Sequence, residues 1–168
     1  MGLFDKIFAK NENKTPEKQK DRITFDSPYG EFVYSAAPAC NEYGYETETD
    51  WYTNGTRADK TTVYIDTDTP ETTEAGICYE RLERLLSDKE RTDLEIKKYA
   101  ADFFLSKPEL LRGDYSEEEL IDELEIVWIG LYRNGDTRFS FDTYWTDADD
   151  VAVVIKADGS KSVVIDGH

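Results

Sequence analysis

Residues 125–133, Glu-Ile-Val-Trp-Ile-Gly-Leu-Tyr-Arg, are the stretch of this chain that decides its fold. Apolar residues occupy both alternating faces of this segment, which is typical of a strand in the middle of a sheet. Asn134-Gly135 follows at once, and this dipeptide is the strongest turn signal in the chain. The segment therefore predicts a central strand that runs directly into a hairpin.

Downstream of this turn the pattern stays strand-like. Residues 137–144 carry Phe139 and Phe141 at alternating positions, as expected of a half-buried strand. Residues 151–155 and 162–165 are apolar runs on either side of Asp158-Gly159, a second turn dipeptide. We expect a second hairpin there.

Upstream of the central strand the sequence predicts helices. Thr69 can cap a first helix, because Pro70 follows it at the position where proline is favoured. Thr92 and Ser116 are each followed three residues later by glutamate, the pattern of a capping box, so helices are expected after both. Apolar residues at helical spacing give the first two helices a core-facing side: Ala75, Cys78, Leu82, Leu85, Ile96, Ala100, Phe103 and Phe104.

The amino-terminal part is again rich in strand signals. Residues 23–25 and 32–34 flank the turn sequence Ser-Pro-Tyr-Gly, and residues 61–66 place Val63 and Ile65 on one side. Residues 43–52 alternate, and Asn54-Gly55 follows them as a hairpin signal. Strands, then helices, then strands predict an α+β fold: a mainly antiparallel sheet from two β-rich ends, with two or three central helices packed on one face.

We expect one folded domain over residues 22–168, preceded by a flexible charged tail over residues 1–21. Residues 9–21 hold no strong apolar side chain, which is typical of a linker. The tail has five lysines and four acids, a net charge of +1, whereas the whole chain carries −17, so the predicted domain carries −18. Nearly all the acidity lies in the folded part.

This charge restricts the partners that we expect. The chain has 37 acidic against 20 basic residues, so binding to nucleic acid phosphates is not expected, and a basic protein is the favoured partner. No apolar run approaches the roughly 20 residues of a membrane-spanning helix. Cys40 and Cys78 lack the dense spacing of a disulfide framework, and we interpret them as reduced thiols of a cytoplasmic protein.

Few residues could carry catalysis. His168 is the single histidine and the last residue of the sequence, where a catalytic partner would be poorly held, and no glycine-rich phosphate loop is present. We therefore expect no cofactor and lean against an enzyme. Three acids, Asp147, Asp149 and Asp150, lie close enough to hold a cation or to share acid and base work, although a solvated loop explains them as well.

Aromatic residues are the more informative excess, with eleven Tyr, eight Phe and three Trp. Several tyrosines alternate with acids or threonines on predicted strands. If helices cover one sheet face, an aromatic and acidic surface on the other face would suit protein binding, since tyrosine contributes area at little entropic cost. A half-buried sheet face with tyrosine hydroxyls at water is the plainer interpretation. The predicted partner-binding residues are Tyr43, Tyr45, Glu46, Glu48, Asp50, Tyr52 and Tyr64.

The order of these motifs resembles the bacterial family of unknown function catalogued as DUF2262. The similarity rests on Tyr29-Gly30-x-Phe32-x-Tyr34, on Trp51, on the aromatic strand end Tyr144-Trp145, and on the final Asp158-Gly159…Ile165-Asp166-Gly167. It covers about residues 22–167 and implies a fold and a bacterial source rather than a reaction. A Gly-His pair that we associate with the family is replaced here by Asp149-Asp150, so any role of that histidine is absent.

Two hypotheses about function follow. The first is a non-catalytic acidic protein-interaction module of the bacterial cytoplasm, such as an immunity-type inhibitor of a basic toxin. The second is a carboxylate-dependent hydrolase that uses Asp147, Asp149 or Asp150, with or without a divalent cation. A concave pocket that gathers two of these acids would favour the second.

Overall fold

The computed structural model describes residues 23–37, 42–51, 60–67 and 72–166. Several predictions concern positions outside these ranges and stay predictions. They are the tail of residues 1–21, Cys40, Tyr52, the Asn54-Gly55 turn, the Thr69-Pro70 cap and His168.

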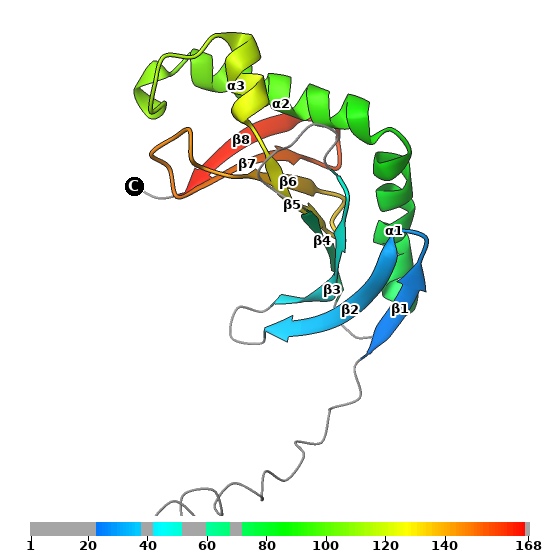
Figure 1. Cartoon of the computed structure of the whole chain (residues 1–168). Helices are drawn as coiled ribbons and strands as arrows, with labels where there is room; N and C mark the ends of the chain where they lie inside the picture. The colour runs from blue at the N-terminus through cyan, green and yellow to red at the C-terminus, as the bar shows by residue number, and fades with distance from the viewer. Residues whose placement is uncertain (1–22, 38–41, 52–59, 68–71, 167–168) are drawn as a thin grey trace, which may run out of the picture.

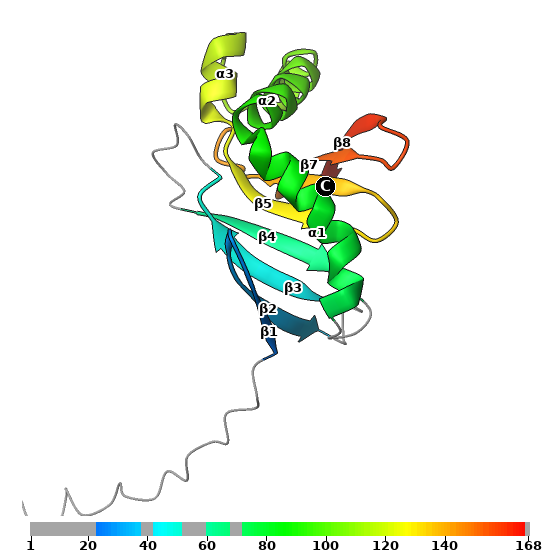
Figure 2. The same ribbon diagram turned by 90° about the vertical axis from the view of Figure 1, so that its right-hand side faces the viewer.

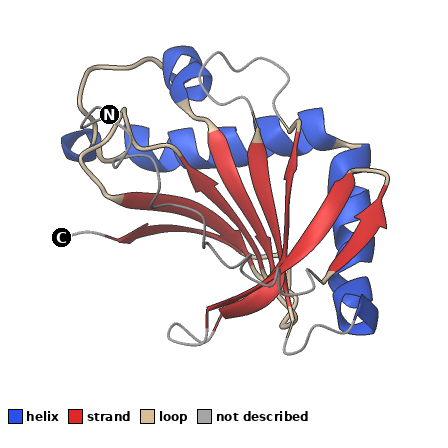
Figure 3. Ribbon diagram, turned by 60° about the horizontal axis from the view of Figure 1, so that its bottom comes forward, coloured by secondary structure: helices blue, strands red, loops and turns tan. Residues whose placement is uncertain are grey.

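Eight strands form one sheet, and their order in the sheet is their order in the chain. Figure 3 shows this sheet with the helices beside it. Every neighbouring pair is antiparallel except β4 and β5, which are parallel. The strands are β1 (Thr24–Ser27), β2 (Gly30–Ala37), β3 (Glu42–Thr49), β4 (Thr61–Asp66), β5 (Ile126–Leu131), β6 (Thr137–Phe141), β7 (Asp150–Ile155) and β8 (Lys161–Asp166).

The helices lie between β4 and β5 in the chain and supply the long crossover that a parallel pair requires. They are α1 (Thr72–Ser87), α2 (Lys89–Leu105) and α3 (Glu117–Glu123), with a single 3₁₀ turn, η1 (Pro108–Leu110), after α2. The capping box at Ser116 and Glu119 is confirmed. The box expected at Thr92 is wrong, because α2 begins one turn earlier, with Asp88 as its N-cap.

The mixed α+β class and the mainly antiparallel sheet are confirmed, and residues 125–133 contain the central strand β5, with β4 and β6 on either side. The arrangement as two separate β-rich ends is wrong. The two ends are halves of one continuous sheet, joined by the parallel pairing of Val63 with Ile129 and its neighbours. The sheet dominates the fold, and the helices pack against it in two separate places.

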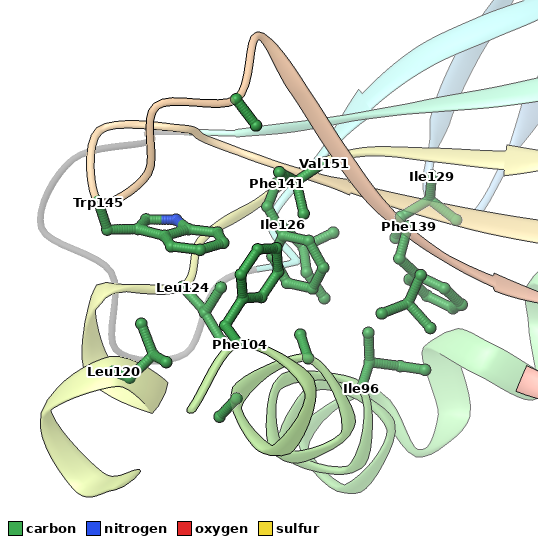
Figure 4. Close-up of a cluster of buried hydrophobic side chains, with 14 of the residues drawn as sticks. Ile96, Phe104, Leu120, Leu124, Ile126, Ile129, Phe139, Phe141, Trp145 and Val151 are labelled. Atoms are coloured by element: carbon green, nitrogen blue, oxygen red, sulfur yellow. The ribbon is translucent and has the colours of Figure 1, made fainter. Parts of the chain in front are cut away.

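The core divides accordingly into two clusters. Cys78 and Leu82 of α1 are fully buried and pack with side chains of the first half of the sheet, among them Phe32, Tyr45 and Ile65. The larger cluster joins α2 and α3 to the second half, and Figure 4 shows it around Phe104. The Phe104 ring meets the Trp145 ring edge to face, with the ring centroids 4.6 Å apart.

The sheet is strongly curved, and α1 and α2 lie outside the curve (Figures 1 and 2). We call the face that carries Tyr45, Ile65, Ile129 and Phe139 the outer face, because these residues belong to the two clusters that contain helix side chains. The opposite face, which carries Glu46, Tyr64, Trp128 and Arg138, is the inner face. Strand alternation assigns the members of each face.

Candidate functional site

The candidate site is a row of residues that crosses the middle of the inner face. Glu46 on β3 lies directly opposite Tyr64 on β4, Tyr64 opposite Gly130 on β5, and Gly130 opposite Arg138 on β6. Neighbouring strands are about 4.8 Å apart, so roughly 14 Å separate the two ends of this row. A carboxylate therefore stands at one end of the row and a guanidinium at the other.

Two aromatic rings stack between these ends, the buried Tyr64, which is only 8% exposed, and the half-buried Trp128. The rings of Tyr64 and Trp128 are nearly parallel, at 22°, with centroids 5.7 Å apart. Each ring occupies space that a glycine leaves: a Cβ at Gly44 would come within 2.3 Å of the Tyr64 ring, and a Cβ at Gly130 within 2.3 Å of the Trp128 ring. The two glycines thus allow the rings to approach the backbone closely.

The third ring, Tyr132, is tilted against the other two. It makes angles of 60° with Tyr64 and 54° with Trp128, at centroid distances of 6.3 and 6.4 Å. Together the three rings line an open hollow of about 670 Å³, which we call the aromatic hollow. Its polar lining comes from Glu46, Asp66, Arg133, Arg138 and Ser140. The Tyr64 hydroxyl donates to the backbone oxygen of Tyr43 at 2.9 Å, which fixes this ring in place.

Both arginines of the hollow are engaged with aspartates. Arg133 Nε lies 3.2 Å from Asp66 Oδ2. Arg138 pairs with Asp150 across the β6–β7 pair, and its Nε donates to Ser140 Oγ at 3.1 Å. Their charges are thereby compensated inside the protein.

Glu46 is different. Its side chain is exposed, and among the described residues no ion pair involves it. Glu46 also borders a second hollow of about 660 Å³ on β2, β3 and β4, which we call the acidic hollow because Glu31 and Glu48 line it as well. Lys60 is the basic residue of that lining. The two hollows meet at Glu46 and form one continuous surface.

The predicted partner-binding residues divide between the faces. Tyr45 lies on the outer face and is fully buried, and this burial, with Tyr34 nearby, raises the pKa of its hydroxyl. Tyr43 shares that face and is half-buried, so neither tyrosine joins the acids in one surface. Glu46 and Glu48 are exposed on the inner face, Asp50 is exposed just beyond β3, and Tyr64 lies in the aromatic hollow.

The predicted partner-binding residues did not include Trp128, Tyr132 and Arg138, although Tyr132 is one of the tyrosines noted on the predicted strands. They follow from no local pattern, since β5 is apolar on both faces and Trp128 is indistinguishable there from a core residue. The available signal was Gly130, because a glycine inside a strand often marks a place where another group approaches the backbone. Gly44, beside the predicted tyrosines, carried the same signal.

The three acids at the end of the β6–β7 loop and the start of β7 do not converge. Asp147 pairs with Arg112 at 2.7 Å, Asp150 pairs with Arg138, and Asp149 is exposed. Within the described ranges, no group of three His, Cys, Asp or Glu side chains has the geometry to hold a metal ion. The loop therefore offers no observation in favour of a hydrolase. Cys78, the thiol among the helix residues, is fully buried against the outer face.

No helix in the described part of the chain has both the length and the apolar character needed to cross a membrane. Comparison of the chain with protein-family models, curated proteins and solved structures found no significant match to any of them. The resemblance to DUF2262 therefore stays a prediction.

Proposed function

We propose that this protein is a non-catalytic interaction module of the bacterial cytoplasm whose inner sheet face binds a basic region of a partner protein, in the manner of an immunity protein that inhibits a basic toxin. The observation that carries the proposal is the aromatic hollow itself. Trp128, Tyr64 and Tyr132 gather on a face that curves inward, beside the exposed carboxylate of Glu46.

The residue types suit a protein interface. Tryptophan, tyrosine and arginine are the side chains most enriched among residues that dominate binding energy, and they act best in the centre of a patch. Here Tyr64 and Trp128 lie on the middle strands β4 and β5 and Tyr132 directly follows β5, while charged residues complete the lining. Such a centre would be shielded from water once a partner covers the charged rim.

The charge of the chain favours a basic partner. The net charge is −17, and Glu31, Glu46 and Glu48 concentrate part of it along the acidic hollow. Opposite charge on the partner would accelerate encounter and make binding sensitive to salt. We therefore expect the complex to form fastest at low ionic strength.

A pair of charge-reversal variants tests the proposal. Glu46→Lys with Glu48→Lys changes the inner face, and Glu80→Lys with Glu83→Lys makes the same change in net charge on exposed positions of α1. The tagged chain and both variants are incubated with extract of the source cells at low and high salt, and bound proteins are identified and quantified by mass spectrometry.

We expect the wild type and the α1 variant to retain the same basic protein at low salt, and the inner-face variant to lose it roughly tenfold or more, because like charges would face each other. Loss in both variants would mean that net charge alone attracts the partner. Equal retention in both, or no captured protein at either salt concentration, would contradict the proposal.

A further inference from the structure

We infer that the aromatic hollow is a binding site for one guanidinium group, the side chain of an arginine on the basic partner, which stacks on the exposed part of the Trp128 ring and donates to the carboxylate of Glu46. This inference rests on the proposed function and names the group that the inner face recognises. Three properties of the hollow support it: its charge balance, the shape of its floor, and the position of its carboxylate.

The charge balance indicates a single cation. The lining contains two carboxylates, Glu46 and Asp66, and two guanidinium groups, Arg133 and Arg138. Asp66 accepts from Arg133, and Asp150, just outside the lining, accepts from Arg138. Both arginines are thus matched by an aspartate, and Glu46 remains as the lining carboxylate for which the described residues provide no ion pair.

The floor favours a planar cation. Trp128 is half-buried and lies against the backbone at Gly130, and the Tyr64 ring, only 8% exposed, stacks with it at 22°. The partly exposed Trp128 ring is therefore the flat aromatic surface that a ligand can reach. A cation over a ring face is attracted by the quadrupole of the ring, most strongly over tryptophan. Guanidinium is flat and weakly hydrated, so it stacks on such a surface with less desolvation than the compact ammonium of lysine.

The position of Glu46 fits the same group. It lies directly opposite Tyr64 in the strand register, is exposed, and lines the same hollow as Trp128. A guanidinium that stacks flat on a ring directs its N–H groups sideways, in the plane in which a carboxylate can accept two of them. Arg138, at the far end of the row, is tied to Asp150 and Ser140, which keeps its own head group near β6 and β7.

The test uses a small compound, N-acetyl-arginine amide, titrated into the full chain and followed by the indole N–H signals of tryptophan in NMR spectra. The chain has three tryptophans, and Trp51 and Trp145 are only 1% exposed. Trp128 is half-buried in the hollow, so its signal reports on binding and the other two serve as internal references. A Trp128→Phe variant assigns the signal.

We expect the Trp128 signal alone to shift, with an affinity in the millimolar range. The neutral citrulline analogue, which has nearly the same shape, should bind roughly tenfold more weakly, and the lysine analogue should fall between the two. Glu46→Gln should weaken binding of the arginine compound by about tenfold. Glu80→Gln, which makes the same change in charge at an exposed position of α1 away from the hollow, should leave it unchanged.

The inference is overturned if the Trp128 signal does not move, if citrulline amide moves it equally, or if Glu80→Gln weakens binding as much as Glu46→Gln. These outcomes are separable from failure of the proposed function. If the arginine compound does not bind but capture of the partner still depends on the inner face, the interaction module stands and only the guanidinium site falls. If the compound binds but capture of a partner does not depend on the inner face, the guanidinium site stands and the proposed interaction module falls.

Discussion

The two faces of the sheet are built from the same strands and differ in almost everything else. Outer-face residues such as Phe139 and Ile129 are fully buried against helices. On the inner face, Trp128 and Tyr132 keep part of their surface in contact with water. The arginines that line the hollow there, Arg133 and Arg138, each pair with an aspartate. Successive side chains of a strand point to opposite faces of the sheet. One face therefore stabilises the fold, and the other is available to a ligand.

This contrast teaches where large residues serve stability and where they do not. Burial of a large side chain contributes several kcal/mol only when water is removed from most of its surface, and that condition holds on the outer face. On the inner face, burial of the half-exposed rings contributes less to stability. Their contacts instead hold them in one orientation, which is useful for recognition. Substitutions can show whether the separation is real.

The largest effect is expected from matched truncations of one aromatic residue on each side. Phe104→Ala removes a fully buried ring from the cluster between α2 and the outer face, and should lower the free energy of unfolding by about 3–5 kcal/mol. Trp128→Ala removes a larger but half-buried ring and should cost only about 1–2 kcal/mol. Urea unfolding followed by circular dichroism measures both.

If Trp128→Ala cost as much as Phe104→Ala, the inner face would be part of the core, and its rings would not be spare for binding. If Phe104→Ala cost as little as Trp128→Ala, the packing of α2 on the sheet would be loose. Either result would break the division between the two faces.

The outer face was within reach of sequence reasoning, and the inner site was not. The period of two in residues 137–141 and the apolar character of residues 125–133 are local properties, so the strands were predictable. The parallel pairing of β4 with β5 was not, because about 60 residues of helices and loops separate the two strands. The aromatic hollow draws its residues from β3, β4, β5 and β6, and only that pairing brings them together.

Tyr45 illustrates a second limit. Strand alternation places Tyr43 and Tyr45 on one side of β3 and the two acids, Glu46 and Glu48, on the other, although the prediction joined all four in one surface. It could not decide which side faces the core, because tyrosine is compatible with both a buried and a wet environment. The packing of Phe25, Phe32 and Tyr34 around Tyr45 decides it, and that packing is a property of the folded sheet.

An intermediate effect is expected from Gly130→Ala. The new Cβ would lie 2.3 Å from the Trp128 ring, so the ring must move, although its outer edge can do so without displacing the backbone. We expect a loss of about 1–2 kcal/mol in stability, together with a shifted Trp128 indole signal and weaker binding of N-acetyl-arginine amide.

Gly113→Ala is the matched control, because its Cβ would meet only the Tyr115 ring, at an ordinary 3.5 Å. It should change neither stability nor the tryptophan signals appreciably. An unchanged Trp128 signal in Gly130→Ala would show that this ring does not lie flat over the glycine, and the floor of the hollow would have to be described differently.

The smallest effect concerns Asp136, in the turn between β5 and β6, where the two faces end. The Lys156 ammonium, 2.8 Å from its carboxylate, and the backbone N–H of Ala157 hold the pKa of Asp136 below its ordinary value of 3.8. A lowered pKa in the folded state contributes stability that is complete above about pH 4, and that is lost as the pH falls below 3.8 through the folded value. Asp136→Asn should therefore be less stable than the wild type at neutral pH, and the difference should shrink in acid.

Urea unfolding of both proteins at several pH values between neutral and about pH 2 measures this difference. Glu119 and Asp158, whose pKa values are also lowered, by hydrogen bonds from Ser116 and Ser160, titrate in both proteins and cancel from it. Lys156→Met should return the pKa of Asp136 toward 3.8 and remove most of its pH dependence. If the difference in the free energy of unfolding between wild type and Asp136→Asn did not change with pH, the contact of Asp136 with Lys156 would not stabilise the fold.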